Sequence, residues 1–329
     1  MDKKELHYEY NSKNINLDLE DFFNFTKDEL AFFALSKRLK YKVINIPKKW
    51  WGVRKLHTPV YKLKEAQRII LKEILYKDFD KLLIHNITWF IPWKNIKDNA
   101  KFHIWKKYLI KFDIKDFFPS ITKDRIYWMF RKQYDYDHKT SILLSWLCCY
   151  NNELPQWAPT SPMLSNLIAR FLDYQIIWLL KKYNYNLEWL ELTYSRYADD
   201  LTFSFNKKIN IQKFIDYIIS IMLDEWFFPN YKKIHLISSK NQQRVTGIIV
   251  NDKIGVWRKY YKKFKSIFYN IEKNWFMQEM IKWNSKNNKK IINIDSFKYI
   301  LQWYLSYIKD ISPDYYIKLK EFNVDLTHK

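Results

Sequence analysis

Residues 194–205 read Tyr-Ser-Arg-Tyr-Ala-Asp-Asp-Leu-Thr-Phe-Ser-Phe, an aromatic run that is interrupted by one pair of adjacent carboxylates. The run predicts two short strands joined by a tight turn at Asp199 and Asp200. Carboxylates at a hairpin tip repel each other and raise each other's pKa, so they need a compensating positive charge. Asp is a common turn former, and a solvated turn is the alternative interpretation. The apolar flanks favour instead a buried strand pair whose tip binds a divalent cation.

A further candidate ligand lies upstream of this hairpin. Residues 110–121 read Ile-Lys-Phe-Asp-Ile-Lys-Asp-Phe-Phe-Pro-Ser-Ile, which predicts an apolar strand that delivers Asp113 and breaks at Pro119. Three carboxylates on adjacent strands fit two Mg²⁺ ions, which are hard cations that take carboxylate and phosphate oxygens. Such an ion pair stabilises both the attacking and the leaving oxygen in phosphoryl transfer. Asp113, Asp199 and Asp200 are therefore the predicted metal ligands.

Length, composition and charge restrict the class of protein. The 329 residues, 48% of them hydrophobic, can bury a large core and are expected to form subdomains. A formal net charge of +22 favours nucleic acid as the partner. No apolar run is long enough to span a membrane, and the first residues lack the apolar core of a signal peptide. The adjacent Cys148 and Cys149 predict buried thiols in a reducing cytoplasm.

The Tyr-Ala-Asp-Asp motif, together with the upstream Phe-Asp-x-x-x-Phe-Phe, resembles the active site of reverse transcriptases. The resemblance assigns Asp113, Asp199 and Asp200 to two Mg²⁺ ions that catalyse attack of a primer hydroxyl on a deoxynucleoside triphosphate. It implies an α+β right-hand polymerase fold with fingers, a palm made of an antiparallel sheet backed by helices, and a helical thumb. The expected divisions are a helical extension at 1–40, fingers at 41–110, a palm at 111–253 with a fingers insertion at about 123–155, and a thumb at 254–329.

The same resemblance predicts a nucleotide-binding set. Lys49 and Arg54 surround the turn of a predicted hairpin at 41–56, where reverse transcriptases cover the incoming triphosphate; a solvated loop tip is the alternative. Gln156 is expected to contact nucleotide and template, and Lys233 to lie near the triphosphate. Phe118 aligns with the bulky residue that blocks a ribose 2′-hydroxyl.

Two further motifs resemble signatures of retron reverse transcriptases. They are Asn99-Ala100-x-x-His103 and Val245-Thr246-Gly247, and the resemblance implies that Asn99, His103, Val245, Thr246 and Gly247 contact the cognate RNA. The implied partners are a structured non-coding RNA that serves as template and primer, the RNA–DNA hybrid, deoxynucleoside triphosphates and an effector protein. The implied product is single-stranded DNA linked to RNA, used in phage defence. Another bacterial reverse transcriptase, intron-like or defence-associated, and a non-catalytic RNA-binding scaffold remain as alternatives.

Glycine and tryptophan occur in unusual numbers. The chain has 3 glycines and 15 tryptophans, whereas average usage predicts about 23 glycines in this length. Trp157 follows Gln156 where reverse transcriptases carry glycine. Similar positions in predicted turns are held by Trp51, Trp89, Trp93, Trp226 and Trp303. We hypothesise that many of these residues are UGA codons that the host reads as glycine. Indoles that stack on bases are the alternative.

Overall fold

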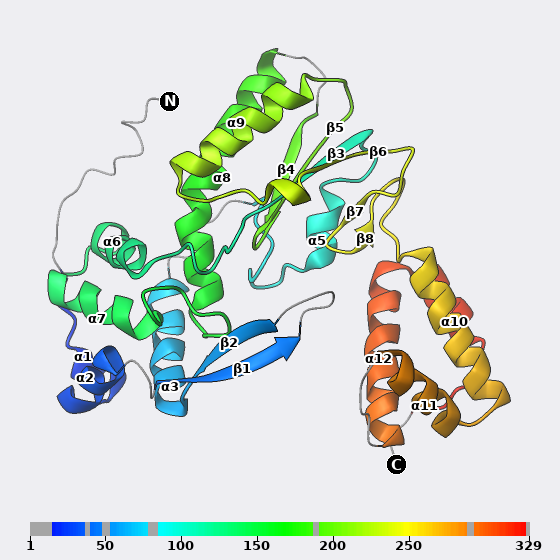
Figure 1. The fold of residues 1–329 in the computed structure, drawn as a ribbon, viewed down its shortest axis with the longest axis horizontal. Helices are drawn as coiled ribbons and strands as arrows, with labels where there is room; N and C mark the ends of the chain where they lie inside the picture. Colours follow the sequence, from blue (N-terminus) through cyan, green and yellow to red (C-terminus); the bar gives the residue numbers. More distant parts are fainter. Residues whose placement is uncertain are drawn as a thin grey trace.

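A four-stranded antiparallel sheet with the strand order β4-β5-β3-β6 forms the centre of the computed structural model (Figure 1). The structure describes residues 15–36, 40–47, 53–77, 85–186, 191–287 and 293–326. The sheet strands are β3 (Tyr108–Asp113), β4 (Thr193–Tyr197), β5 (Asp200–Phe205) and β6 (His235–Ser238). Aromatic side chains on neighbouring strands pack against one another, such as Phe112 on Phe203 with ring centroids 5.5 Å apart. The predicted strand pair at 194–205 and the strand that ends at Asp113 are confirmed.

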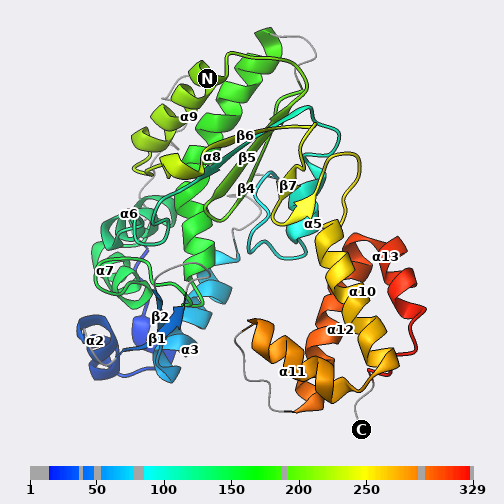
Figure 2. The same cartoon turned by 45° about the vertical axis from the view of Figure 1, so that its right-hand side comes forward.

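Two long helices cover one face of this sheet (Figures 1 and 2). They are α8 (Ser161–Asn186) and α9 (Ile211–Asp224). The helix α9 begins where Asn210 accepts a hydrogen bond from the Lys213 amide, and it buries an apolar stripe with a spacing of four residues, namely Phe214, Ile218 and Met222. Both helices reach the sheet, because Phe214 of α9 packs on Phe203 of β5 and Asp173 of α8 pairs with Arg196 of β4. These helices fix the position of the strands that carry the carboxylates.

The N-terminal part forms a hairpin and a group of helices below the sheet in Figure 1. Thr26 and Glu29 form a capping box at the start of α2. Residues 123–148 form two helices, because the chain turns at Asp135 (φ 57°) and Asp137 caps the second one through the Thr140 amide. Cys148 and Cys149 are buried free thiols, as predicted. The elements are α1 (Leu19–Phe23), α2 (Lys27–Leu35), β1 (Tyr41–Pro47), β2 (Val53–Pro59), α3 (Tyr61–Ile69) with its π-helical continuation η2 (Ile70–Leu75), α6 (Lys123–Gln133) and α7 (His138–Cys148).

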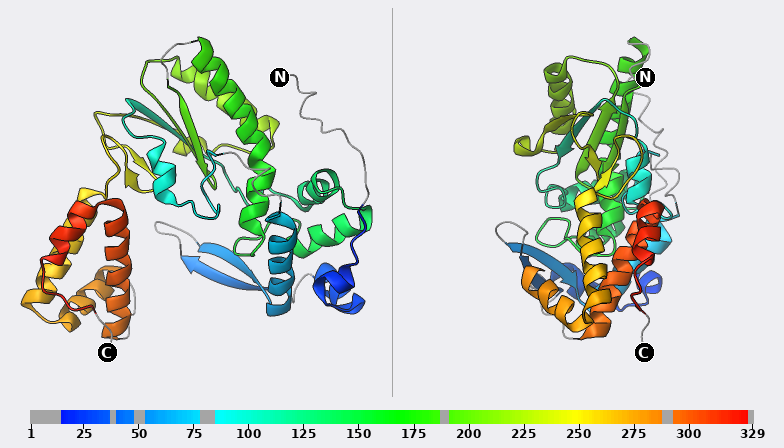
Figure 3. Two further views of the ribbon diagram at one scale, coloured as in Figure 1. Left: turned by 180° about the vertical axis from the view of Figure 1, so that it is seen from behind. Right: turned by 90° about the vertical axis from the view of Figure 1, so that its right-hand side faces the viewer.

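The C-terminal part is helical and has a core of its own. Its helices are α10 (Arg258–Lys273), α11 (Phe276–Asn287), α12 (Ile294–Ile311) and α13 (Pro313–Lys320). This core continues into α5 (Ile96–Lys101) and the small hairpin β7 (Arg244–Val245) and β8 (Ile248–Ile249), because Ala100, Val245 and Ile248 belong to the same buried cluster. The terminal helices and the β1–β2 hairpin lie on the same side of the sheet (Figure 3). The fold is therefore the expected α+β hand. In the parts that the structure describes, no helix is both long and apolar enough to span a membrane.

Candidate active site

The sheet brings the three predicted carboxylates to one edge. Asp113 is the last residue of β3, and it lies directly opposite Asp200, the first residue of β5. Asp199 lies in the turn before β5, and its carbonyl accepts a hydrogen bond from the Ile114 amide at 2.9 Å. Ala198 adopts a left-handed conformation (φ 55°), which makes the turn tight. Residues from distant parts of the chain thus meet because β3 and β5 pair in this register.

The carboxylate of Asp113 is held by a short segment that follows α9. Its Oδ2 accepts a hydrogen bond from Lys233 Nζ at 2.8 Å, and its Oδ1 accepts one from Asn230 Nδ2 at 3.1 Å. Lys233 lies on the 3₁₀ turn η3 (Tyr231–Lys233), and the Asn230 amide donates to the Asp113 carbonyl at 2.8 Å. Lys233 was a predicted site residue. Asn230 was not, and its only signal in the sequence is its place three residues before Lys233.

The site has an excess of negative charge. Burial, followed by the charge of Asp200, raises the pKa of Asp199 to about 6. Burial also raises the pKa of Asp200. The positive charge of Lys111 opposes this shift, and the negative charge of Asp113 adds to it. The hydrogen bond to Asp113 raises the pKa of Lys233, so this lysine remains charged. Each ionised carboxylate therefore disfavours ionisation of the neighbouring carboxyl groups, and a bound cation would relieve this repulsion.

The donor set fits a hard divalent cation. The three side chains offer oxygen ligands only, which is the chemistry that Mg²⁺ and similar ions prefer. Within the described residues, no group of three or more His, Cys, Asp or Glu side chains is already gathered as a metal cage. Asp113 instead faces Lys233 and Asn230. Asp113, Asp199 and Asp200 are the residues that would hold the cation, and the cation would supply charge stabilisation for phosphoryl oxygens.

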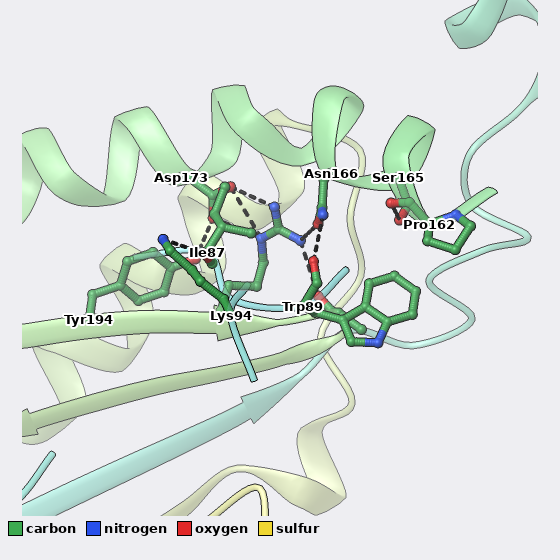
Figure 4. A network of polar contacts seen from close by, with 10 residues as sticks. Ile87, Trp89, Lys94, Pro162, Ser165, Asn166, Asp173 and Tyr194 are labelled. Carbon is green, nitrogen blue, oxygen red and sulfur yellow. Dashed lines mark hydrogen bonds and ion pairs between the residues drawn. The ribbon is translucent and has the colours of Figure 1, made fainter. Parts of the chain in front are cut away.

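A buried polar network supports the turn from behind (Figure 4). The fully buried Arg196 of β4 forms an ion pair with Asp173 of α8 at 2.7 Å, and its Nη1 donates to the Asn166 side chain at 3.2 Å and to the Ala198 carbonyl at 3.3 Å. The Tyr194 hydroxyl donates to Asp173 at 2.6 Å. Asn166 in turn donates to the Trp89 carbonyl at 2.8 Å. The network therefore joins α8, β4 and the segment around Trp89 to the turn that carries Asp199.

The other predicted nucleotide-binding residues lie in different surroundings. The half-buried Phe118 packs edge-to-face on Trp89, with centroids 5.8 Å apart, and the same indole reaches Tyr197 at 6.3 Å. Phe118 is therefore connected through one ring to the β4–β5 hairpin that carries Asp199. Gln156 is half-buried in the turn that leads into α8. Arg54 belongs to β2 by its backbone, but its side chain and the whole of Lys49 lie outside the described residues.

Asn99 and His103, which were predicted to contact RNA, are both buried in this structure. The imidazole of His103 lies between the hydroxyls of Ser204 and Ser195, at 2.7 Å from each. Burial lowers its pKa to about 3, so the ring is neutral, and its one donor and one acceptor are both satisfied. His103 thus joins the segment after α5 to β4 and β5. The sequence motif carries no signal for this burial.

The second signature lies beside the first. Thr246 Oγ1 donates to the Ile96 carbonyl of α5 at 3.1 Å, so the β7–β8 turn packs on the helix that contains Asn99. Val245 is buried in this contact, whereas Gly247 is exposed. Gly247 adopts φ 85°, and an added Cβ would meet no atom within 4 Å. Of the five residues predicted to bind RNA, Gly247 and the half-buried Thr246 therefore remain accessible.

Comparison with known proteins agrees with this geometry. The family model for reverse transcriptase (RNA-dependent DNA polymerase) matches residues 46–250. The retron Ec86 reverse transcriptase of Escherichia coli is 31% identical over 258 residues, which are 77% of this chain and 77% of that protein. The retron Ec73 reverse transcriptase of Escherichia coli is 31% identical over 292 residues, or 83% of this chain and 85% of that protein. Among solved structures, a telomerase from Candida albicans in complex with a fragment of telomeric RNA covers 85% of this chain and 61% of its own at 12% identity, with a TM-score of 0.49. The chain belongs to the retron reverse transcriptases and is an RNA-directed DNA polymerase.

Proposed function

We propose that this enzyme copies a structured non-coding RNA of its own into single-stranded DNA that remains joined to that RNA. The observation that carries the catalytic part is the direct pairing of Asp113 with Asp200 next to Asp199. This pairing gathers three carboxylates from distant parts of the chain at the end of a rigid sheet. Two Mg²⁺ ions bound there would stabilise the attacking hydroxyl and the leaving pyrophosphate.

The roles of the surrounding side chains follow from charge and position. The contact with Asp113 at 2.8 Å places the ammonium group of Lys233 at the same edge of the sheet as the carboxylates. There it would neutralise the oxygens of a bound triphosphate. We assign Phe118, which packs against Trp89, to the exclusion of a ribose 2′-hydroxyl. Gln156 is assigned to nucleotide and template contact, and Lys49 and Arg54 to the triphosphate.

We further propose that the cognate RNA binds along the β7–β8 turn and the terminal helices. The turn exposes the backbone at Gly247, where a nucleic acid can approach closely because no side chain intervenes. The net charge of +22 favours a polyanion in general. In this proposal residues 41–110 act as fingers, 111–253 as palm and 254–329 as thumb. The RNA-linked DNA would serve phage defence together with an effector protein.

The experiment separates this function from its alternatives by supplying two templates. One is RNA transcribed from the DNA that flanks the gene, and the other is poly(rA) primed with oligo(dT). We expect labelled product from the flanking transcript that migrates as one species in a denaturing gel and becomes shorter after RNase treatment. Asp199→Asn should reduce synthesis on both templates by at least about 100-fold, because Asp199 is a proposed metal ligand and the loss of even a residue that only supports a ligand costs about 10- to 100-fold.

Each alternative gives its own result. Extension of oligo(dT) without an RNA-linked product from any flanking transcript would indicate another type of bacterial reverse transcriptase. Binding of the flanking RNA with no synthesis on either template, unchanged by Asp199→Asn, would indicate a non-catalytic scaffold. Asp216→Asn, an exposed carboxylate of α9, is the matched control and should leave both activities unchanged.

A further inference from the structure

Four tryptophans adopt a backbone conformation that large side chains avoid. Trp93, Trp105, Trp157 and Trp226 have φ values of 60°, 62°, 78° and 58°. All four are exposed, by 88%, 71%, 64% and 73% of their surface. In this region of φ a bulky side chain crowds its own backbone, and glycine is the residue that adopts it without strain. An exposed indole gains little packing in return, so nothing offsets this strain.

At Trp226 the surrounding hydrogen bonds define a motif that normally requires glycine. The helix α9 ends at Asp224, and Glu225 is its C-cap. The Phe227 amide donates to the Met222 carbonyl at 2.8 Å, and the Trp226 amide donates to the Leu223 carbonyl at 3.0 Å. These two bonds, with Phe227 and Met222 both buried, form a Schellman motif. Trp226 occupies its left-handed position, where glycine is the usual residue.

At Trp93 the sequence and a hydrogen bond fit a type II turn, and at Trp157 the φ value fits its third position. Ile91 to Lys94 form a turn closed by a hydrogen bond from the Lys94 amide to the Ile91 carbonyl at 3.1 Å. Pro92 is at its second position and Trp93 at its third, and a type II turn takes proline and glycine there. Trp157 has φ 78°, close to the value of about 80° that the third position of this turn requires.

We infer that the protein made in its natural host carries glycine at positions 93, 105, 157 and 226, because its gene writes them as UGA and the host reads UGA as glycine. Other residues of the described chain also have positive φ, Phe90 among them, and these four positions are the ones that combine it with tryptophan. Trp105 has no counterpart among the positions that the sequence pattern indicated. Trp303 lies inside α12, and Trp89 is not among the left-handed residues, so the backbone does not require glycine there. Trp51 lies outside the described residues.

The codons of the gene and the mass of the natural protein test the inference. We expect UGA at all four positions, and we expect peptides from host cells to have the mass of glycine there. Codons of UGG at these positions, or tryptophan in the peptide that follows Gln156, would overturn it. Neither measurement depends on what the enzyme synthesises.

Recombinant variants test the same inference by stability. Glycine normally lowers stability in regular structure, but we expect Trp93→Gly, Trp105→Gly, Trp157→Gly and Trp226→Gly each to raise Tm, by about 2 °C. Trp178→Gly is the matched control, because Trp178 is similarly exposed at 52% but lies inside α8. The control should lower Tm, since glycine is unfavourable in a helix interior. Equal losses in the turn variants and in the control would contradict the inference.

A further measurement, the rate of DNA synthesis by these variants, rests on the proposed function. If the backbone at position 157 approaches the nucleotide, Trp157→Gly should also increase DNA synthesis, whereas Trp226→Gly, at the end of α9, should change mainly Tm. A rise in Tm without a gain in synthesis would retain the glycine inference and count against the role assigned to the segment around Gln156.

Discussion

Asp199 carries a charge that the metal-free fold disfavours. Burial and Asp200 raise its pKa from 3.8 to about 6. A carboxyl whose pKa is higher in the folded than in the unfolded state destabilises the fold when it is ionised, and the penalty fades as the pH falls from 6 towards 4. We therefore predict that Asp199→Asn raises the Tm of the metal-free enzyme by about 3 °C at pH 8, and by clearly less at about pH 4.5.

Melting curves in the presence of a chelator at both pH values check this prediction. Asp216→Asn on the exposed face of α9 is the control, and it should show no comparable pH dependence. The same substitution that stabilises the fold should abolish polymerisation, because function requires the repelling carboxylates that a cation neutralises. A gain in Tm of equal size at both pH values would show that the charge of Asp199 is not the cause.

At the scale of elements, the ion pair between Arg196 and Asp173 connects α8 to the strand that ends at the catalytic turn (Figure 4). Removing one partner of a buried pair leaves an uncompensated charge and costs about 3–5 kcal/mol. Asp173→Asn should therefore lower stability strongly. Arg196→Lys keeps the charge but loses the forked guanidinium group, which also donates a hydrogen bond to the Ala198 carbonyl. We predict that it lowers DNA synthesis about 10-fold, mainly by raising the Mg²⁺ concentration needed for half-maximal rate.

Arg131→Lys separates this positioning effect from a general loss of stability. Arg131 is half-buried in α6 and donates to the Tyr136 carbonyl at 2.7 Å, away from the carboxylates. This variant should have a Tm lower by a few degrees and an unchanged Mg²⁺ requirement. If Arg196→Lys shows the same pattern as Arg131→Lys, the network serves stability alone.

The elements also show what the sequence could predict. Local patterns identified the strand pair around Asp199 and the strand ending at Asp113, because strands that are buried on one face show a periodic pattern of apolar residues. The meeting of Asp113 with Asp199 and Asp200 at one edge of the sheet followed from their motif. The pairing of Arg196 with Asp173 and of Asn230 with Asp113 could not be predicted from local patterns, because each contact depends on how distant elements pack. The burial of Asn99 and His103 could not be predicted either, because the motif from which their contact with RNA was predicted carries no information on burial.

At the scale of the whole molecule, the terminal helices present a basic face. The helix α10 buries Phe264, Ile267 and Phe268, whereas Lys262 and Lys265 are exposed on its other side. These helices lie on the same side of the sheet as the β1–β2 hairpin, so a duplex that reaches the carboxylates would pass them in the proposed thumb. Lysine side chains bind phosphates in a sequence-independent way, and this binding weakens with salt.

We predict that Lys262→Gln with Lys265→Gln weakens binding of an RNA–DNA hybrid regardless of its sequence. The slope of log affinity against log salt concentration should become shallower by about 1 for each phosphate that the variant no longer neutralises. The matched control is Lys181→Gln with Lys213→Gln, which removes the same charge from exposed positions on α8 and α9 at the opposite end of the molecule (Figure 1). The control should leave the salt dependence unchanged. Equal effects of the two double variants in titrations from low to high salt would mean that net charge attracts the duplex and that α10 does not contact it.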